Sequence, residues 1–232
     1  MSKRTILVLV IALIIGAACG VGRPGGEPGD PGSGAGPGTS EQQPDADEFE
    51  GDVRGAVTVA ERYWRQQFSY AGARFTPIRQ VIAYERDGQV RCGRAPLTRN
   101  NAAYCPAGDF IAYDVNWAAA AFRQIGDAFL FFLLGHEYAH GIQVRLGIQY
   151  QFTIEQELQA DCLAGAYIGD SIRDKQLQLE DGDLEELRAG LIAVGDDPGQ
   201  PWFAPGAHGD AEARTKAFFA GYQGSIKECG LA

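Results

Sequence analysis

The sequence predicts an α+β fold that is dominated by helices and carries a small sheet. Three observations favour this class. Several long segments place apolar side chains every three or four positions, as an amphipathic helix requires. Two shorter segments are rich in β-branched or alternating apolar residues, which is typical of strands. No segment repeats along the chain, so a repeat architecture is not expected.

The N-terminus has the pattern of an export signal. Lys3 and Arg4 precede an apolar run over residues 6–18, which is short for a membrane span of roughly 20 residues. Cys19 follows "GAA", which resembles a bacterial lipobox, where the cysteine becomes the lipidated first residue. We therefore expect residues 1–18 to be a lipoprotein signal peptide and Cys19 to anchor the exported protein to the outer face of a bacterial membrane. The alternatives are a secreted form and a single N-terminal span.

The segment after the expected lipidation site differs in composition from the rest of the chain. Residues 19–48 are rich in Gly and Pro and nearly free of apolar side chains, so we expect a disordered tether. Residues 49–232 are long enough to form one hydrophobic core. Removal of the signal leaves 18 basic and 30 acidic residues, a net charge of −12. This balance argues against nucleic acid as a partner and against electrostatic docking to anionic lipid.

The first half of this domain shows a helix and two strands. Residues 50–72 have helical spacing of apolar side chains. Residues 74–88 are β-branched and end in a turn signal, so they predict a strand, and a cysteine-bounded loop follows. Residues 108–116 alternate between apolar and polar positions, which predicts a second short strand.

The second half is helical. From Trp117 the spacing is that of a helix, with a break near Gly126 and a long helix over residues 127–146. Its "FLFFLL" run is apolar on all sides, which predicts a helix at the centre of the core. Further helices are expected over residues 153–172, 183–195 and 209–222, and a Gly- and Pro-rich loop separates the last two.

Four cysteines remain after Cys19, and an even number in an exported chain predicts two disulfides with three possible connectivities. Proximity favours Cys92–Cys105, a loop of about 14 residues that contributes roughly 3 kcal/mol in the chain-entropy model. Cys162–Cys229 is then the second bond. A cysteine zinc site is the alternative, but the chain has no CxxC pair.

The stretch "LLGHEYAHGIQ" holds two of the three histidines in the chain. On a helix His136 and His140 lie one turn apart on the same face, so both imidazoles can reach one Zn²⁺. Glu137 then points to the side where a zinc-bound water would lie, as a general base requires. The alternative is a helix whose histidines are hydrogen-bonded within the protein.

A catalytic zinc needs a third protein ligand and one open position. In "ELQAD", Glu157 and Asp161 are four residues apart and share one face of the next predicted helix. Glu157 can be the third ligand, and Asp161 can accept the free ring N–H of a ligating histidine and so fix its orientation. A solvated acidic face is the alternative, but the stretch is apolar, where an unpaired carboxylate is costly.

The remaining histidine, His208, follows the Gly- and Pro-rich loop at the start of a helix, and Arg214 lies six residues further on. A cation or N–H donor near the metal can stabilise the oxyanion of a tetrahedral intermediate. A histidine on the surface at a helix start is the alternative.

Together, "HEYAHGIQ", "ELQADCLAG", "GDD" and "HGDAEAR" resemble the neutral zinc metallopeptidase family of bacteria, a gluzincin-type group with the pattern HExxH…ExxxD. The resemblance spans roughly residues 92–229, including the four cysteines and "FIAYDV". The chain departs from the family at Tyr138, Ala139 and Gly141, and none of these positions is a predicted ligand.

The resemblance implies a zincin-like fold and one Zn²⁺ per chain, held by His136, His140 and Glu157. It implies that Glu137 acts as base and then as proton donor to the leaving amine. By the same analogy His208 assists the transition state and Arg214 orients it.

We therefore expect a zinc metallopeptidase, an endopeptidase acting on a peptide or protein substrate. The substrate strand is expected to pair with an edge strand at residues 109–115, and reduction of Cys162–Cys229 is expected to loosen metal binding. The alternative is a catalytically inactive, zinc-stabilised envelope lipoprotein that acts as a binding or scaffold module. Such a protein would keep the metal ligands but would have no need of Glu137, which is present.

Overall fold

The computed structural model describes residues 46–231. The predicted signal peptide, the lipidation site Cys19 and the predicted tether up to residue 45 lie outside the described residues. The last three residues assigned to the tether, 46–48, already belong to the first helix. Among the described residues, no helix is both long and apolar enough to cross a membrane.

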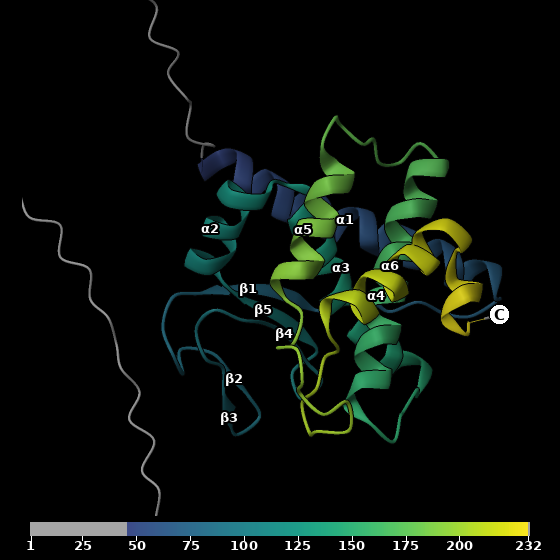
Figure 1. Cartoon of the computed structure of the whole chain (residues 1–232). Helices are drawn as coiled ribbons and strands as arrows, with labels where there is room; N and C mark the ends of the chain where they lie inside the picture. Colours follow the sequence, from purple (N-terminus) through teal and green to yellow (C-terminus); the bar gives the residue numbers. More distant parts are fainter. Residues whose placement is uncertain (1–45, 232) are drawn as a thin grey trace, which may run out of the picture. The chain divides into compact units, whose positions relative to one another are not determined.

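Helices dominate the described part of the chain, and a small mixed sheet accompanies them (Figure 1), so the predicted α+β class is confirmed. The α-helices are α1 (Ala46–Tyr70), α2 (Val115–Ile125), α3 (Ala128–Leu146), α4 (Thr153–Arg173), α5 (Asp183–Ala193) and α6 (Ala211–Gly224). A 3₁₀ helix, η1 (Ile226–Cys229), ends the described chain. The break between α2 and α3 lies at Gly126, whose φ of 128° favours glycine.

The main sheet has the strand order β1 (Gln80–Tyr84), β5 (Phe110–Asp114) and β4 (Ala102–Cys105). β1 pairs with β5 in parallel and β4 pairs with β5 antiparallel. The short strands β2 (Arg91–Cys92) and β3 (Ala95–Pro96) form a separate hairpin.

The prediction that residues 109–115 form an edge strand was wrong. This segment is β5, which is buried along its whole length and hydrogen-bonded on both sides, so it lies in the centre of the sheet. The edge strands are β1 and β4, and β4 lies in the segment that the sequence predicted to be a loop. Its "AAYC" has no clear alternation, and its pairing with β5 is a contact that local pattern cannot show.

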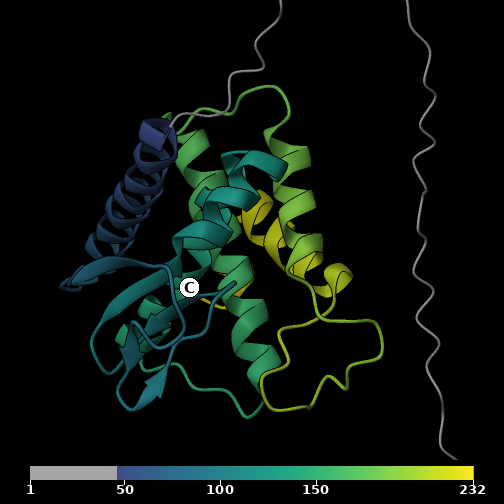
Figure 2. The ribbon, with the colours of Figure 1, turned by 90° about the vertical axis from the view of Figure 1, so that its left-hand side faces the viewer.

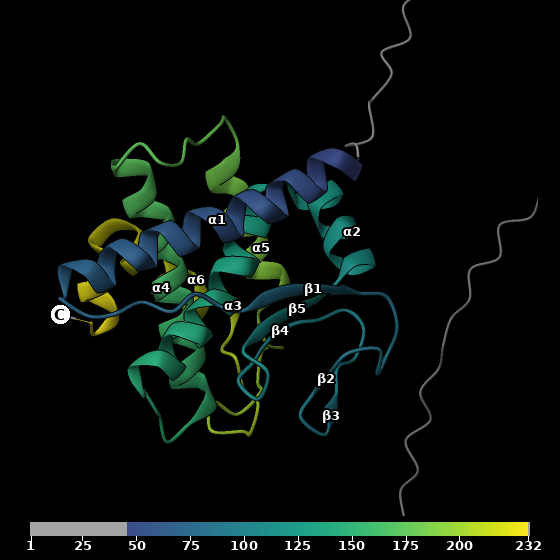
Figure 3. The same ribbon diagram turned by 180° about the vertical axis from the view of Figure 1, so that it is seen from behind.

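The core is built around α3, as its apolar run predicts. Every residue of "FLFFLL" except Phe131 is buried. Helix α1 lies across α3 and α4 (Figure 3), and its buried face, which includes Tyr63 and Trp64, packs into the same core. Viewed from the side (Figure 2), α1 runs along one side of the helices and the loop over residues 196–208 lies on the other. β4 lies beside α3.

Helices α4 and α6 approach each other through glycines. A Cβ atom at Gly221 of α6 would lie 1.9 Å from the backbone oxygen of Cys162 on α4, and one at Gly165 would lie 1.9 Å from the backbone oxygen of Phe218. These distances leave no room for a side chain. The contact fixes α6 against the helix that carries Glu157 and Asp161.

We expect Gly221→Ala to destabilise the protein by about 1–3 kcal/mol or more, because an added methyl group would force two backbones apart. Urea unfolding followed by circular dichroism measures the change. The matched control is Gly51→Ala on α1, where nothing lies within 4 Å of the added atom. This control should stabilise the helix by about 0.5–1 kcal/mol. Equal unfolding free energies for the two variants would contradict the packing argument.

Candidate metal centre

Three side chains from two helices converge on one point. The Nε2 atoms of His136 and His140 on α3 are 3.1 Å apart. Oε2 of Glu157 on α4 lies 3.1 Å from Nε2 of His136 and 3.4 Å from Nε2 of His140. The three ligand atoms lie within 4.8 Å of one another and can hold a metal ion. Two imidazoles and one carboxylate are a donor set that zinc uses when one position stays open.

The electrostatics of the cluster favour a cation. Burial by itself lowers the pKa of His136, but the carboxylates of Asp161 and Glu157 outweigh it and raise this pKa to about 10. Burial by itself raises the pKa of Glu157, but hydrogen bonds to the two histidines hold it below its usual value. The two carboxylates therefore stabilise positive charge at His136. The residues present fit a divalent cation at this point.

Asp161 holds the first histidine in place. Its side chain has no exposed surface, and its Oδ1 lies 2.8 Å from Nδ1 of His136. Because Nδ1 is engaged in this way, Nε2 is left to face the metal position. Asp161 is in turn held by Arg214, which donates from Nε to Oδ2 and from Nη2 to Oδ1, both at 2.8 Å. Burial by itself raises the pKa of Asp161, but Arg214 and His136 lower it.

The resemblance implies that Arg214 orients His208, but the two side chains have separate partners. Both line the same cavity as the three predicted ligands. Arg214 is buried against Asp161 and the carbonyl of Val194, and among the described residues no hydrogen bond joins it to His208. His208 instead lies against Asp196, with its Nδ1 3.5 Å from Oδ1 and its backbone N–H donating to Oδ2 at 2.7 Å. Reasoning from the sequence missed this role of Asp196, although "GDD" was part of the resemblance.

Glu137 lies beside the cluster and faces the edge strand. The side chain is 6% exposed, and Oε2 accepts a hydrogen bond from the backbone N–H of Tyr104 in β4 at 2.7 Å. This contact ties the predicted base to β4, the edge strand that lines the cavity over the cluster. No local sequence pattern predicts this contact, because Tyr104 and Glu137 are 33 residues apart.

A cavity of about 570 Å³ opens over these groups. One wall is the free side of β4, and apolar side chains form another part of the lining. These apolar residues include Trp117, Leu133, Val144 and Val194. The cavity therefore offers both backbone groups and an apolar surface next to the predicted metal position.

The structure contains both disulfides, Cys92–Cys105 and Cys162–Cys229. Cys105 ends β4 and follows Tyr104, while Cys162 follows Asp161 on α4. The first disulfide is thus next to Tyr104, which donates to Glu137, and the second is next to Asp161, which contacts His136.

Helix α3 thus carries two histidines one turn apart with a glutamate between them, and α4 carries a glutamate and an aspartate that face them. This arrangement is the HExxH…ExxxD pattern of gluzincins, and three of its side chains could hold a metal ion. The model of the family described as "Putative neutral zinc metallopeptidase" matches residues 1–231. The chain belongs to this family. No curated protein and no solved structure matches it.

Proposed function

We propose that this protein is a zinc-dependent peptidase that hydrolyses internal bonds of a peptide or protein substrate, with one Zn²⁺ held by His136, His140 and Glu157. The observation that carries the proposal is the joint position of three groups. The convergent ligands, the carboxylate of Glu137 and the free edge of β4 all line one cavity. A scaffold that only bound zinc would need the convergent ligands, but neither Glu137 nor the free edge of β4.

The free edge of β4 supports an extended peptide as the substrate. The Asn101 carbonyl accepts a hydrogen bond from the Asp114 N–H, so the backbone groups of Asn101 face β5. Backbone groups alternate in direction along a strand, so those of Ala103, two residues further on, also face β5. Those of Ala102 and Tyr104 point the other way, toward the cavity. The Tyr104 N–H is used by Glu137, which leaves the N–H and C=O of Ala102 and the C=O of Tyr104 to pair with a peptide backbone.

Zinc bound at this site would supply Lewis-acid chemistry, polarising the peptide carbonyl and lowering the pKa of water toward about 7. Glu137 lines the same cavity, and its carboxylate would take a proton from the attacking water and deliver it to the leaving amine nitrogen. The backbone N–H of His208 donates to Asp196, which holds this residue at the cavity. A ring N–H of His208 could then donate to the carbonyl oxygen as negative charge develops there. Arg214 acts through Asp161 to orient His136, not by orienting His208.

Metal analysis together with an activity assay tests the proposal. The purified protein should contain about one zinc per chain and should cleave casein, and a chelator should abolish the cleavage until zinc is restored. Glu157→Gln should lose most of the zinc, because a neutral amide is a poor replacement for an anionic ligand. The matched control is Gln156→Ala, at the preceding position of α4, which should keep zinc. A protein that takes up no zinc after reconstitution would refute the proposal.

A further inference from the structure

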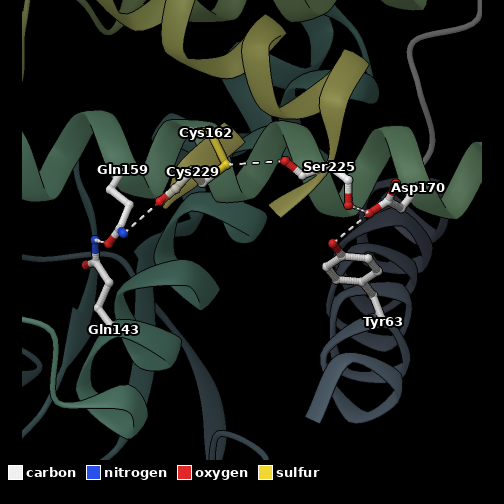
Figure 4. Close-up of a disulfide and its surroundings, with 7 residues drawn as sticks. All are labelled: Tyr63, Gln143, Gln159, Cys162, Asp170, Ser225 and Cys229. Atoms are coloured by element: carbon white, nitrogen blue, oxygen red, sulfur yellow. Dashed lines mark hydrogen bonds between the residues drawn. A yellow bond between two sulfur atoms is a disulfide. The ribbon is translucent and has the colours of Figure 1, made fainter. Parts of the chain in front are cut away.

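The second histidine of the cluster is held by a chain of buried amides. Nδ1 of His140 lies 2.8 Å from Oε1 of Gln143. Nε2 of Gln143 donates to Oε1 of Gln159 at 3.0 Å, and Nε2 of Gln159 donates to the carbonyl of Cys229 at 2.9 Å. Figure 4 shows the part of this chain that runs from Gln143 through Gln159 to Cys229. Gln143 and Gln159 are only 1% and 8% exposed, so water does not replace these partners.

The end of the chain fixes its direction. A backbone carbonyl can only accept, so Gln159 must turn its amide N–H₂ toward Cys229 and its oxygen toward Gln143. Gln143 must then donate to Gln159. It also donates to the carbonyl of Gln156 at 2.8 Å, a second group that only accepts. Both donors of Gln143 are thus engaged away from His140, and its oxygen is left to face the ring.

The consequence at His140 is a defined tautomer. Because the oxygen of Gln143 only accepts, Nδ1 of His140 must carry the proton. The lone pair then lies on Nε2, the atom that faces His136 and Glu157. If Gln143 turned its amide over, it would favour the other tautomer, in which Nε2 carries a proton and cannot bind a metal.

The far end of the chain is anchored covalently. Cys229 belongs to η1 and is bonded to Cys162, which follows Asp161 on α4. The carbonyl that terminates the chain is therefore held against the helix that supplies Glu157. The two histidines are oriented by different means: His136 by an anionic carboxylate paired with Arg214, and His140 by neutral amides.

We propose that Gln143 and Gln159 are positioning residues, which fix the orientation and tautomer of His140 for metal binding and which are held by the Cys162–Cys229 bond. This inference rests on the metal site of the proposed function. It assigns a role to two residues whose identity the pattern HExxH…ExxxD does not specify. It also explains why the C-terminal disulfide adjoins the site.

Zinc affinity, measured by competition with a chromophoric chelator, tests the chain directly. Methionine matches glutamine in length but cannot accept from Nδ1, so Gln143→Met should weaken zinc binding about 10- to 100-fold. Gln159→Met should weaken it less, by about 3- to 10-fold, because Gln156 still holds Gln143. The visible absorption bands of the Co²⁺-substituted protein should shift in both variants, because these bands report the geometry of the ligands. The Cys162→Ala/Cys229→Ala double variant should resemble Gln159→Met.

The matched control is Ser225→Ala, near the same disulfide. Ser225 and Tyr63 both donate to Asp170, and this network (also drawn in Figure 4) holds the C-terminal segment without reaching His140. The variant should bind zinc as the wild type does and leave the Co²⁺ spectrum unchanged. Wild-type zinc affinity and spectrum in both glutamine variants would overturn the inference. An equal loss of affinity in Ser225→Ala would also overturn it, as a general effect of instability. If Gln143→Met does not fold, Gln159→Met decides. A wild-type protein that binds no zinc would overturn the metal site itself, and the positioning role with it.

Discussion

Glu137→Gln should lower peptidase activity by about 10²- to 10⁴-fold, the contribution typical of general acid–base catalysis. Glutamine has the same shape but cannot take a proton from water at neutral pH. Its side-chain oxygen can still accept from the Tyr104 N–H, so the contact between α3 and β4 is kept. Zinc content and thermal stability should stay close to those of the wild type. Initial rates on casein, with zinc measured in the same samples, provide the test.

The matched control is Glu185→Gln on the exposed surface of α5, which removes the same charge far from the chemistry and should leave the rate unchanged. The experiment also separates the enzyme from the inactive zinc-stabilised scaffold. An active wild type whose rate survives Glu137→Gln would remove Glu137 from the mechanism. A wild type that binds zinc and cleaves nothing would favour the scaffold.

Arg214→Met should destabilise the folded protein by about 3–5 kcal/mol, the usual result of removing one partner of a buried ion pair. Arg214 is 4% exposed and Asp161 is not exposed at all, so the remaining carboxylate would be buried without its cation. His136 would lose the rigid support of Asp161, and zinc affinity should fall as well. Urea unfolding of the zinc-free proteins measures the stability change separately from the contribution of the metal.

The expected pH dependence follows from the lowered pKa of Asp161 in the wild type. A carboxyl group whose folded-state pKa is lowered adds stability above its ordinary value of 3.8, and this contribution is lost as the pH falls. The difference between wild type and Arg214→Met should therefore shrink below about pH 4.

Two further variants control for the loss of charge. Arg214→Lys keeps the charge without the two-point geometry and should recover only part of the stability. Arg54→Met breaks an exposed pair with Glu50 and should cost less than about 1 kcal/mol. A loss in Arg214→Met no larger than that in Arg54→Met would contradict the structural role of the buried pair.

The local features of the site could be read from the sequence. His136, Glu137 and His140 lie on a single helix, and helical geometry alone fixes which of them share a face. The same is true of Glu157 and Asp161 on α4. The long apolar run before the histidines likewise predicted a central helix, because burial on all sides leaves no polar face to display. The four cysteines were paired by their spacing along the chain.

The partners of these groups depended on the tertiary structure. Arg214 meets Asp161 across 53 residues, and Gln159 meets Cys229 across 70. The place of β4 at the edge of the sheet and of β5 at its centre also depends on pairing between distant strands.

The sequence by itself determined the helical framework, the HExxH and ExxxD motifs and, through the family resemblance, membership of the zinc metallopeptidase family. It could do so because each motif is complete within about one or two helical turns, where backbone geometry relates the side chains to one another. Only the tertiary structure decided which strand faces the cavity and which side chain contacts His140. It also decided that Asp161 holds Arg214 and that a different carboxylate, Asp196, holds His208. Those contacts join segments whose distance along the chain carries no periodic signal, and they form only when the helices and strands have packed.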